Sequence, residues 1–200
     1  DVRAKLTIAP NVTIQFKNNG GLNIASNGIL VANGTMANPI VMKGDVDVPG
    51  VWRGLYFQSN NVQNELTYCT VSNAGSASFD GNSTKLANIR VALNAKLKIS
   101  NCTISKSAKD GLYADGLDFD EQNPITSFSN NTFTDNQNYP LSVLGATANV
   151  LDAGSSFSGN TKNKVLLRGG QLHGTHVWKK LAVPYLIESV VSAGYTSSSG

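Results

Sequence analysis

The sequence predicts an all-β fold, a parallel β-helix wound from a single chain, because one four-residue phrase recurs in the same direction along it. Each copy holds a small or polar residue, a hydroxyl residue, an apolar residue and a second hydroxyl residue. Successive copies start 24 to 33 residues apart, a spacing typical of one coil of a solenoid. The four copies are Cys69-Thr70-Val71-Ser72, Cys102-Thr103-Ile104-Ser105, Asn131-Thr132-Phe133-Thr134 and Ser155-Ser156-Phe157-Ser158.

Short runs of alternating apolar residues, separated by turn residues, indicate that the rest of the chain is also made of strands. Residues 6–16 alternate in this way, and Asn-Gly and Gly-Gly pairs follow at short intervals. The longest helical candidate, residues 177–191, is interrupted by Pro184 and rich in β-branched residues. Because antiparallel strands would reverse the direction of the phrase, we expect stacked parallel coils, roughly eight of about 24 residues each.

The phase of the repeat predicts which side chains face inward. Counted from the apolar residue of each phrase, a second apolar residue follows eight positions later in the last three copies and eighteen positions later in the first. Like positions stack in adjacent coils, so these residues form two inward columns. The first column is Val71, Ile104, Phe133 and Phe157, and the second is Ile89, Leu112, Leu141 and Val165.

Alternation also places the first residue of each phrase inside and the hydroxyl residues outside. Cys69 and Cys102 then fall in the same column of adjacent coils, where a disulfide and a pair of reduced thiols are both compatible with the spacing. The parallel direction of their Cβ atoms favours reduced thiols that act as small core residues. Asn131, in the same column, needs backbone partners.

The composition excludes several functional classes. The 16 basic and 13 acidic residues are scattered, whereas a nucleic-acid binder gathers its basic residues on one stripe, so we expect no nucleic-acid partner. No apolar run approaches the ~20 residues that span a membrane, so we expect no transmembrane segment. Two cysteines are not a disulfide framework. We expect one β-helix domain over residues 1–194 and a flexible tail or linker over 195–200.

The segments 6–16, 34–40, 49–59 and 66–71 resemble the secreted and cell-surface right-handed parallel β-helix proteins of bacteria, within the broad pectate-lyase-like superfamily. The resemblance covers residues from about 5 to 190. It implies a right-handed helix and an exported setting, extracellular or at the cell surface, with a lipid anchor in the full-length protein of many members. It does not imply one activity, because this fold hosts lyases, hydrolases, adhesins and spacers.

Two further features bear on what the resemblance implies. Residues 178–190 resemble the lead-in that such proteins place before another unit, so we expect either that this chain is one module of a longer array or that its last strands close the helix end. The superfamily's hydrolases carry closely paired aspartates and a Gly-His-Gly motif, and this sequence has neither. Its calcium-dependent lyases combine several aspartates with a basic residue, of which Arg90 with Asp115 is a partial match.

One outward column is the main candidate for ligand binding. Aligning Leu55, Ile89 and Leu112 as inward residues places their successors on one outer face. Aromatic rings, a guanidinium and a carboxylate on a flat face suit a saccharide, such as a polysaccharide or cell-surface glycan. An ordinary solvated face with cation–π neighbours is the alternative. The candidate glycan-binding residues are Tyr56, Arg90 and Tyr113, with Gln58 and Asp115 in the adjacent column.

Three other clusters are candidates for metal or catalytic sites. Residues 115–121 hold the densest acidic cluster, Asp115, Asp118, Asp120 and Glu121, which offers oxygen ligands for calcium but matches no established loop motif. Asp45 and Asp47 form a second acidic loop, and a glycosidase needs two carboxylates facing one cleft. His173 and His176 lack the further ligands of a metal site. We therefore predict no catalytic residue and no cofactor, with calcium at the acidic cluster as the alternative.

The functional expectation is a non-catalytic exported or cell-surface module that serves display or adhesion, with glycan binding through the outward column. The alternative is a polysaccharide lyase or glycoside hydrolase acting on acidic polysaccharide, with Arg90 or a nearby lysine as base and calcium held by Asp115 or Asp118. An enzyme needs loops that wall a groove, and residues 76–85 and 116–123 are the two inserts long enough to do so. A lower alternative is ice binding through the outward Thr and Ser ladders.

Overall fold

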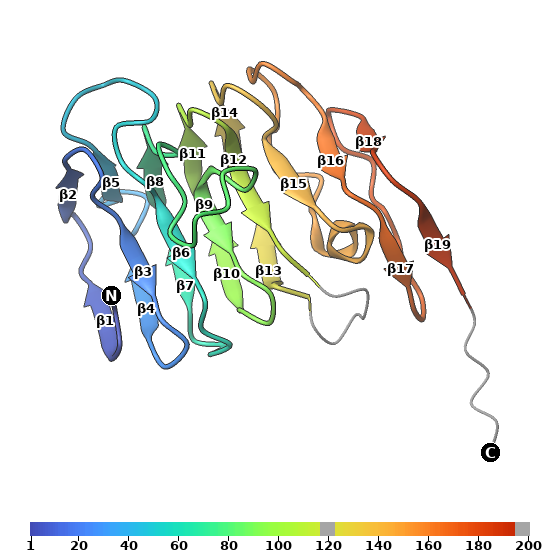
Figure 1. Ribbon diagram of the computed structural model, residues 1–200, viewed down its shortest axis with the longest axis horizontal. Helices are drawn as coiled ribbons and strands as arrows, with labels where there is room; N and C mark the ends of the chain where they lie inside the picture. Colours follow the sequence, from blue (N-terminus) through green and yellow to red (C-terminus); the bar gives the residue numbers. More distant parts are fainter. Residues whose placement is uncertain (117–122, 195–200) are drawn as a thin grey trace.

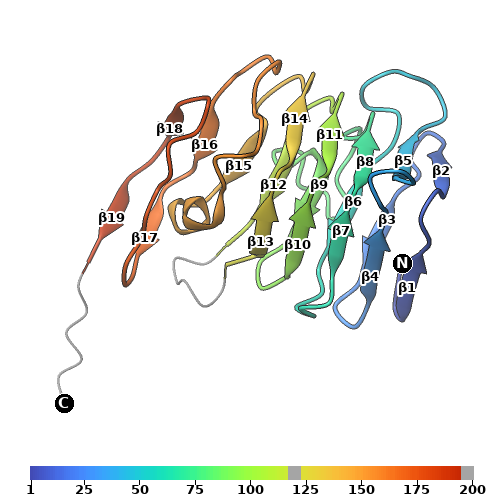
Figure 2. The same ribbon diagram turned by 180° about the vertical axis from the view of Figure 1, so that it is seen from behind.

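The strands stack into a solenoid whose coils follow one another along the long axis of the molecule (Figures 1 and 2). The computed structural model describes residues 1–116 and 123–194. Every strand pairing in this part of the chain is parallel, and each joins one coil to the next. A phrase that recurs in the same direction predicts parallel pairing, because the strands of a meander or a sandwich would pair antiparallel. The fold is therefore a parallel β-helix, as predicted.

Three long sheets form the sides of the helix, and each of the first five coils gives one strand to each of them. Sheet B contains β1 (Lys5–Ile8), β4 (Ile29–Asn33), β7 (Glu65–Thr67), β10 (Leu97–Ser100) and β13 (Ile125–Ser129). Sheet C contains β2 (Thr13–Phe16), β5 (Ile40–Gly44), β8 (Cys69–Ser72), β11 (Thr103–Ser105) and β14 (Thr132–Thr134). Sheet A contains β3 (Leu22–Ile24), β6 (Leu55–Phe57), β9 (Ala87–Val91), β12 (Asp110–Ala114), β15 (Leu141–Val143), β16 (Val165–Leu167) and β18 (Tyr185–Ile187).

The last coils are less regular. The 3₁₀ helix η2 (Gly145–Val150) contacts both β13 and β17 (Gly170–Leu172), so it takes the place of a sheet B strand in the sixth coil. β17 pairs in parallel with β19 (Val191–Ala193), which begins an eighth level. The expected number of roughly eight coils is thus confirmed. The predicted tail, residues 195–200, lies outside the described residues.

The two predicted apolar columns form the core. Val71, Ile104 and Phe133 are in register on β8, β11 and β14, and Phe157 follows in the next coil. All four are fully buried. The rings of Phe128, Phe133 and Phe157 stack inside the core with centroids 5.8–6.1 Å apart. The second column, Ile89, Leu112, Leu141 and Val165, is also in register and fully buried.

A buried polar ladder runs beside the phenylalanine column. Cys69 and Cys102 are free, buried thiols, so the reduced alternative holds. The backbone N–H of Cys69 donates to Cys102 Sγ (3.4 Å), and the N–H of Cys102 donates to Asn131 Oδ1 (3.0 Å). Asn131 Nδ2 donates in turn to the Ile99 carbonyl (3.1 Å), which supplies the backbone partner that this amide needs. Burial and the neighbouring Cys69 raise the pKa of Cys102.

A second ladder, which the sequence analysis did not identify, consists of buried asparagines at the corner between sheets C and A. Asn136 Oδ1 accepts from the Ser107 backbone N–H (3.0 Å), and Asn136 Nδ2 donates to Asn160 Oδ1 (2.8 Å). Asn88 Nδ2 donates to Asn136 Oδ1 (3.4 Å), which extends the ladder by one coil. The stacked asparagine amides form hydrogen bonds with backbone N–H and C=O groups of the turns, which apolar core side chains cannot do.

Candidate functional site

The predicted outward column exists on sheet A, but it is covered. Tyr56 lies in register with Arg90, and Arg90 with Tyr113, as expected from alternation. Only 4–7 % of each residue is exposed, however. The 76–85 loop joins β8 to β9 and is one of the two inserts long enough to wall a groove, as the enzyme alternative requires, but it lies over the column. The expectation of an open flat face is therefore wrong for Tyr56, Arg90 and Tyr113.

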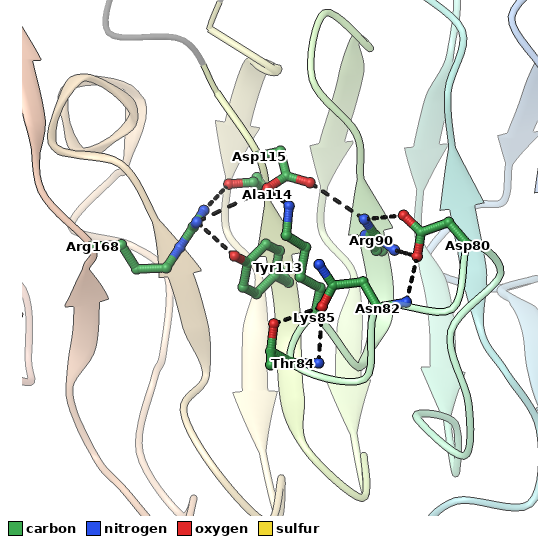
Figure 3. Close-up of polar contacts among 9 residues, drawn as sticks. All are labelled: Asp80, Asn82, Thr84, Lys85, Arg90, Tyr113, Ala114, Asp115 and Arg168. Carbon is green, nitrogen blue, oxygen red and sulfur yellow. Dashed lines mark hydrogen bonds and ion pairs between the residues drawn. The ribbon is translucent and has the colours of Figure 1, made fainter.

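Two side chains of the 76–85 loop account for this cover. The ring of Phe79 stacks on Tyr56, with centroids 5.5 Å apart. Both carboxylate oxygens of Asp80 accept hydrogen bonds from the Arg90 guanidinium, at 2.6 and 2.7 Å (Figure 3). The same guanidinium lies 4.6 Å from the centroid of the Tyr56 ring. The Arg90 bonds lower the pKa of Asp80 to about 2, so this ion pair persists through the neutral and mildly acidic range.

Asp115 is surrounded by cations (Figure 3). Its carboxylate lies 2.8 Å from Lys85 Nζ, 3.5 Å from Arg90 Nη2 and 4.0 Å from Arg168 Nη1. These contacts explain why Asp115 is held on the sheet face, and they occupy the oxygens that a calcium ion would need. The other candidate calcium ligands, Asp118, Asp120 and Glu121, lie outside the described residues.

A pocket of about 360 Å³ opens on sheet A next to this cluster. The Arg168 guanidinium lies 4.0 Å from the centroid of the Tyr113 ring, and Arg168 Nη1 donates to the Tyr113 hydroxyl (2.6 Å). Lys162 Nζ lies 4.5 Å from the centroid of the Tyr139 ring. The pocket thus combines two aromatic rings with two cations. It is lined by Thr84, Asp110, Tyr113, Asn138, Tyr139, Ser142, Lys162, Leu166, Arg168 and Glu188.

Asp110 is the buried carboxyl of this pocket, and only 5 % of the residue is exposed. Its Oδ1 accepts hydrogen bonds from Asn138 Nδ2 (2.6 Å) and from the Tyr139 backbone N–H (3.2 Å). Burial raises the pKa of Asp110 to about 6, although these bonds and the nearby Arg168 and Lys162 act in the opposite direction. The carboxyl therefore changes charge close to neutral pH, which is typical of functional sites.

Tyr113 of the pocket and the neighbouring Asp115 were predicted from the sequence, whereas the other lining residues were not. Val165 belongs to the inward column, so alternation places Leu166 and Arg168 outward, and this step would have found Arg168 beside Asp115. Asp110 was not predicted as a site residue because the alternation of inward and outward side chains breaks at Gly111. A Cβ there would lie 2.9 Å from a ring carbon of Phe133, so position 111 faces the core and Asp110 faces the pocket.

Sheet C carries a second, polar pocket of about 480 Å³. Asp47 binds Lys106 Nζ (2.7 Å) and accepts from Asn73 Nδ2 (3.0 Å), which ties residues 45–49 across this sheet. Ser72 and Ser105 beneath are 8 % exposed, so the hydroxyl ladder weighed for ice binding is not a continuous open face. Asp45 and Asp47 line this pocket on sheet C, whereas Asp115 lies on sheet A, so these carboxylates do not face one cleft.

The two histidines lie close together near β17. His176 Nε2 lies 3.0 Å from the His173 carbonyl oxygen. Across residues 1–116 and 123–194, no three His, Cys, Asp or Glu side chains are grouped as a metal site. No helix in the same ranges is long and apolar enough to cross a membrane. Neither absence identifies a ligand. The candidate binding site is therefore the sheet A pocket.

Comparison with known proteins bears on the fold alone. A family model described as a right handed beta helix region matches residues 87–177, from β9 to beyond β17. This part of the chain carries Asp110, Tyr113, Tyr139, Lys162 and Arg168 of the pocket. Together with the parallel pairing, the match makes the fold a right-handed parallel β-helix. The searches matched no curated protein and no solved structure.

Proposed function

We propose that this chain is a non-catalytic, exported β-helix module that binds a saccharide in the sheet A pocket and serves display or adhesion at a cell surface. The observation that carries the proposal is the convergence of two tyrosines and two cations, Tyr113 with Arg168 and Tyr139 with Lys162, at one pocket. The exported setting follows the resemblance to secreted and cell-surface β-helix proteins.

The chemistry of the pocket suits a sugar. A pyranose ring has an apolar C–H face that packs on aromatic rings and hydroxyl groups that exchange hydrogen bonds with polar side chains. The half-buried Tyr139 offers a ring, and Tyr113, whose ring carries the Arg168 guanidinium, lines the floor beside it. Arg168 and Lys162 donate to hydroxyl or carboxylate oxygens. A volume of about 360 Å³ falls at the lower end of small-molecule sites, which suits one or two sugar units.

A glycan array tests this proposal. We expect the parent chain to bind a defined set of glycans and the Tyr139→Ala/Lys162→Ala double variant to lose that binding. Both residues lie at the pocket edge and outside the apolar core, so the variant is expected to fold. Lys106→Ala, which removes a cation on sheet C, is the matched control and retains binding. Binding that survives in the double variant, or is absent from the parent, contradicts the proposal.

Cleavage of a polysaccharide is the second candidate, and one observation favours hydrolysis. Asp110 is a buried carboxyl with a pKa of about 6 in the same pocket as Glu188, and a raised pKa suits a proton donor to a leaving oxygen. Arg90 is unsuited to be the base of a lyase. Burial alone would lower the pKa of Arg90, but Asp80, Tyr56 and Asp115 raise it and keep the guanidinium protonated.

The assay for this candidate is the release of reducing ends from the glycans that the array identifies. Hydrolysis predicts new reducing ends with the parent chain and none with Asp110→Asn. Binding without any release of reducing ends leaves the non-catalytic proposal standing and eliminates hydrolysis.

A further inference from the structure

Two side chains of the 76–85 loop lie on sheet A as a bound ligand would. Phe79 places a flat ring on Tyr56, inclined by 26° to it, and Asp80 places a carboxylate on Arg90 with two hydrogen bonds. A ring stacked on an aromatic side chain and an anion held by a guanidinium are two contacts with which a protein holds a ligand. Here the chain itself supplies both groups.

The surface under the loop continues the sheet A pocket. Arg90 lies in register between Tyr56 and Tyr113, and Tyr113 lines the pocket. Strands in a sheet are ~4.8 Å apart, so the covered positions extend the pocket by two coils. Arg90 Nε is buried and makes no hydrogen bond in the described part of the chain, which leaves one donor spare beneath the loop.

The loop is attached to the surface without being part of the core. No residue from 76 to 85 is fully buried. Several of its hydrogen bonds are internal, such as those that Asn82 Oδ1 accepts from the backbone N–H (3.1 Å) and the hydroxyl (2.7 Å) of Thr84. Gly81 adopts a φ of 81°, with no atom near the position of a Cβ. Segments with few buried apolar contacts open at low free-energy cost, so the loop can leave while the coils stay intact.

Arg90 has a second partner when the loop leaves. The Asp115 carboxylate lies 3.5 Å from Arg90 Nη2. Asp115 directly follows β12 and is not part of the loop. Displacement of Asp80 therefore does not leave Arg90 as an unpaired buried charge, which would be the main obstacle to opening. Other attachments of the loop include Lys85 on Asp115 (2.8 Å), Arg53 on the Ser78 carbonyl (3.3 Å) and the Ser76 N–H on the Trp52 carbonyl (3.1 Å). These three are polar and replaceable by water, and the Arg53 guanidinium also lies 5.8 Å from the centroid of the Phe79 ring.

We propose that the 76–85 loop is an autoinhibitory cover, in which Phe79 and Asp80 occupy two subsites at Tyr56 and Arg90 that a long saccharide fills after displacing them. This inference rests on the proposed saccharide function of the adjacent pocket. It predicts that short saccharides bind the open pocket whether or not Phe79 and Asp80 are in place, whereas long ones compete with these two side chains.

Titration calorimetry with saccharides of two lengths tests the inference. The probes are cellobiose with cellohexaose and digalacturonate with hexagalacturonate, so that a neutral and an acidic chain are both represented. The Phe79→Ser/Asp80→Asn variant removes the intramolecular ring and charge. Asp47→Asn, which disrupts the comparable ion pair with Lys106 on sheet C, is the matched control. Circular dichroism and thermal unfolding verify that each variant folds like the parent.

The expected result is unchanged affinity for the disaccharide that binds and about tenfold tighter binding of its hexasaccharide by the loop variant alone. Equal hexasaccharide affinities in parent and loop variant, with disaccharide binding retained, overturn the cover but not the pocket. Binding of a hexasaccharide by the loop variant alone, with no disaccharide bound, supports the cover and overturns the pocket. If none of the four probes binds either protein, both proposals fail.

Discussion

The charge of Asp110 is expected to make the stability of the protein depend on pH in a direction that is unusual for a carboxylate. Asp110 Oδ1 accepts from Asn138 Nδ2 and from the Tyr139 N–H, and an asparagine at this position can accept both bonds through its own Oδ1. Asp110→Asn therefore removes the ionisable group while it keeps the local geometry. The difference in stability between the two proteins isolates the cost of charging this site.

The magnitude follows from the pKa of Asp110, about 6 in the folded protein against 3.8 for the ordinary group. At 1.36 kcal/mol per pH unit, the difference corresponds to about 3 kcal/mol. Because the folded state holds the proton more tightly, the stabilising contribution is fully present below pH ~3.8 and is lost as the pH rises through ~6. The parent should thus lose about 3 kcal/mol relative to Asp110→Asn between these limits.

Urea denaturation of the parent and Asp110→Asn at a series of pH values from ~3.5 to ~8 measures this difference. Asp135→Asn, which removes an exposed carboxyl, is the control and is expected to follow the parent. A difference between parent and Asp110→Asn that stays flat with pH, or that grows in favour of the parent as the pH rises, would refute the reasoning. Either result would mean that Asp110 is ionised in the folded protein at acid pH.

The two buried ladders make further predictions. Asn136→Ala should lower the free energy of unfolding by about 1–3 kcal/mol in urea denaturation, because it leaves the buried Ser107 N–H without its acceptor. An effect as small as that of the exposed Asn18→Ala, under ~0.5 kcal/mol, would contradict this. Cys69 and Cys102 should not react with a thiol reagent in native buffer and should both react after denaturation, because burial makes both thiols inaccessible to the reagent. Rapid reaction of the native protein would disprove that placement.

Much of the fold was predictable because a β-helix repeats its constraints. Each coil places Val71, Ile104 or Phe133 at the same height in the core, so the pattern in one coil is tested by the next. The same logic located Cys69 and Cys102 in adjacent positions. The 3₁₀ helix η2 was not predicted, because Gly145–Val150 is a run of small residues without apolar alternation. Its position is determined by packing against β13 and β17 on either side.

The candidate site was only partly predictable, because its parts follow different rules. Tyr113 lies on β12 and Arg168 directly follows the last residue of β16, so alternation along each strand predicts their direction. Tyr139 and Lys162 lie in turns, and their approach to the pocket depends on the path of each turn between coils, which the repeat does not specify. The contact of Asp80 with Arg90 depends on an insertion within one coil, for which no neighbouring coil offers a comparison.

The measurement that tests the central claim most directly is amide chemical-shift mapping of the parent chain, titrated with the glycan that the array identifies. A saccharide in the sheet A pocket should shift the amides around Asp110, Tyr113, Tyr139, Lys162 and Arg168 and leave those of sheet C unchanged. Shifts confined to the sheet C pocket, around Ser72, Ser105 and Lys106, would contradict the assignment of the binding site to sheet A.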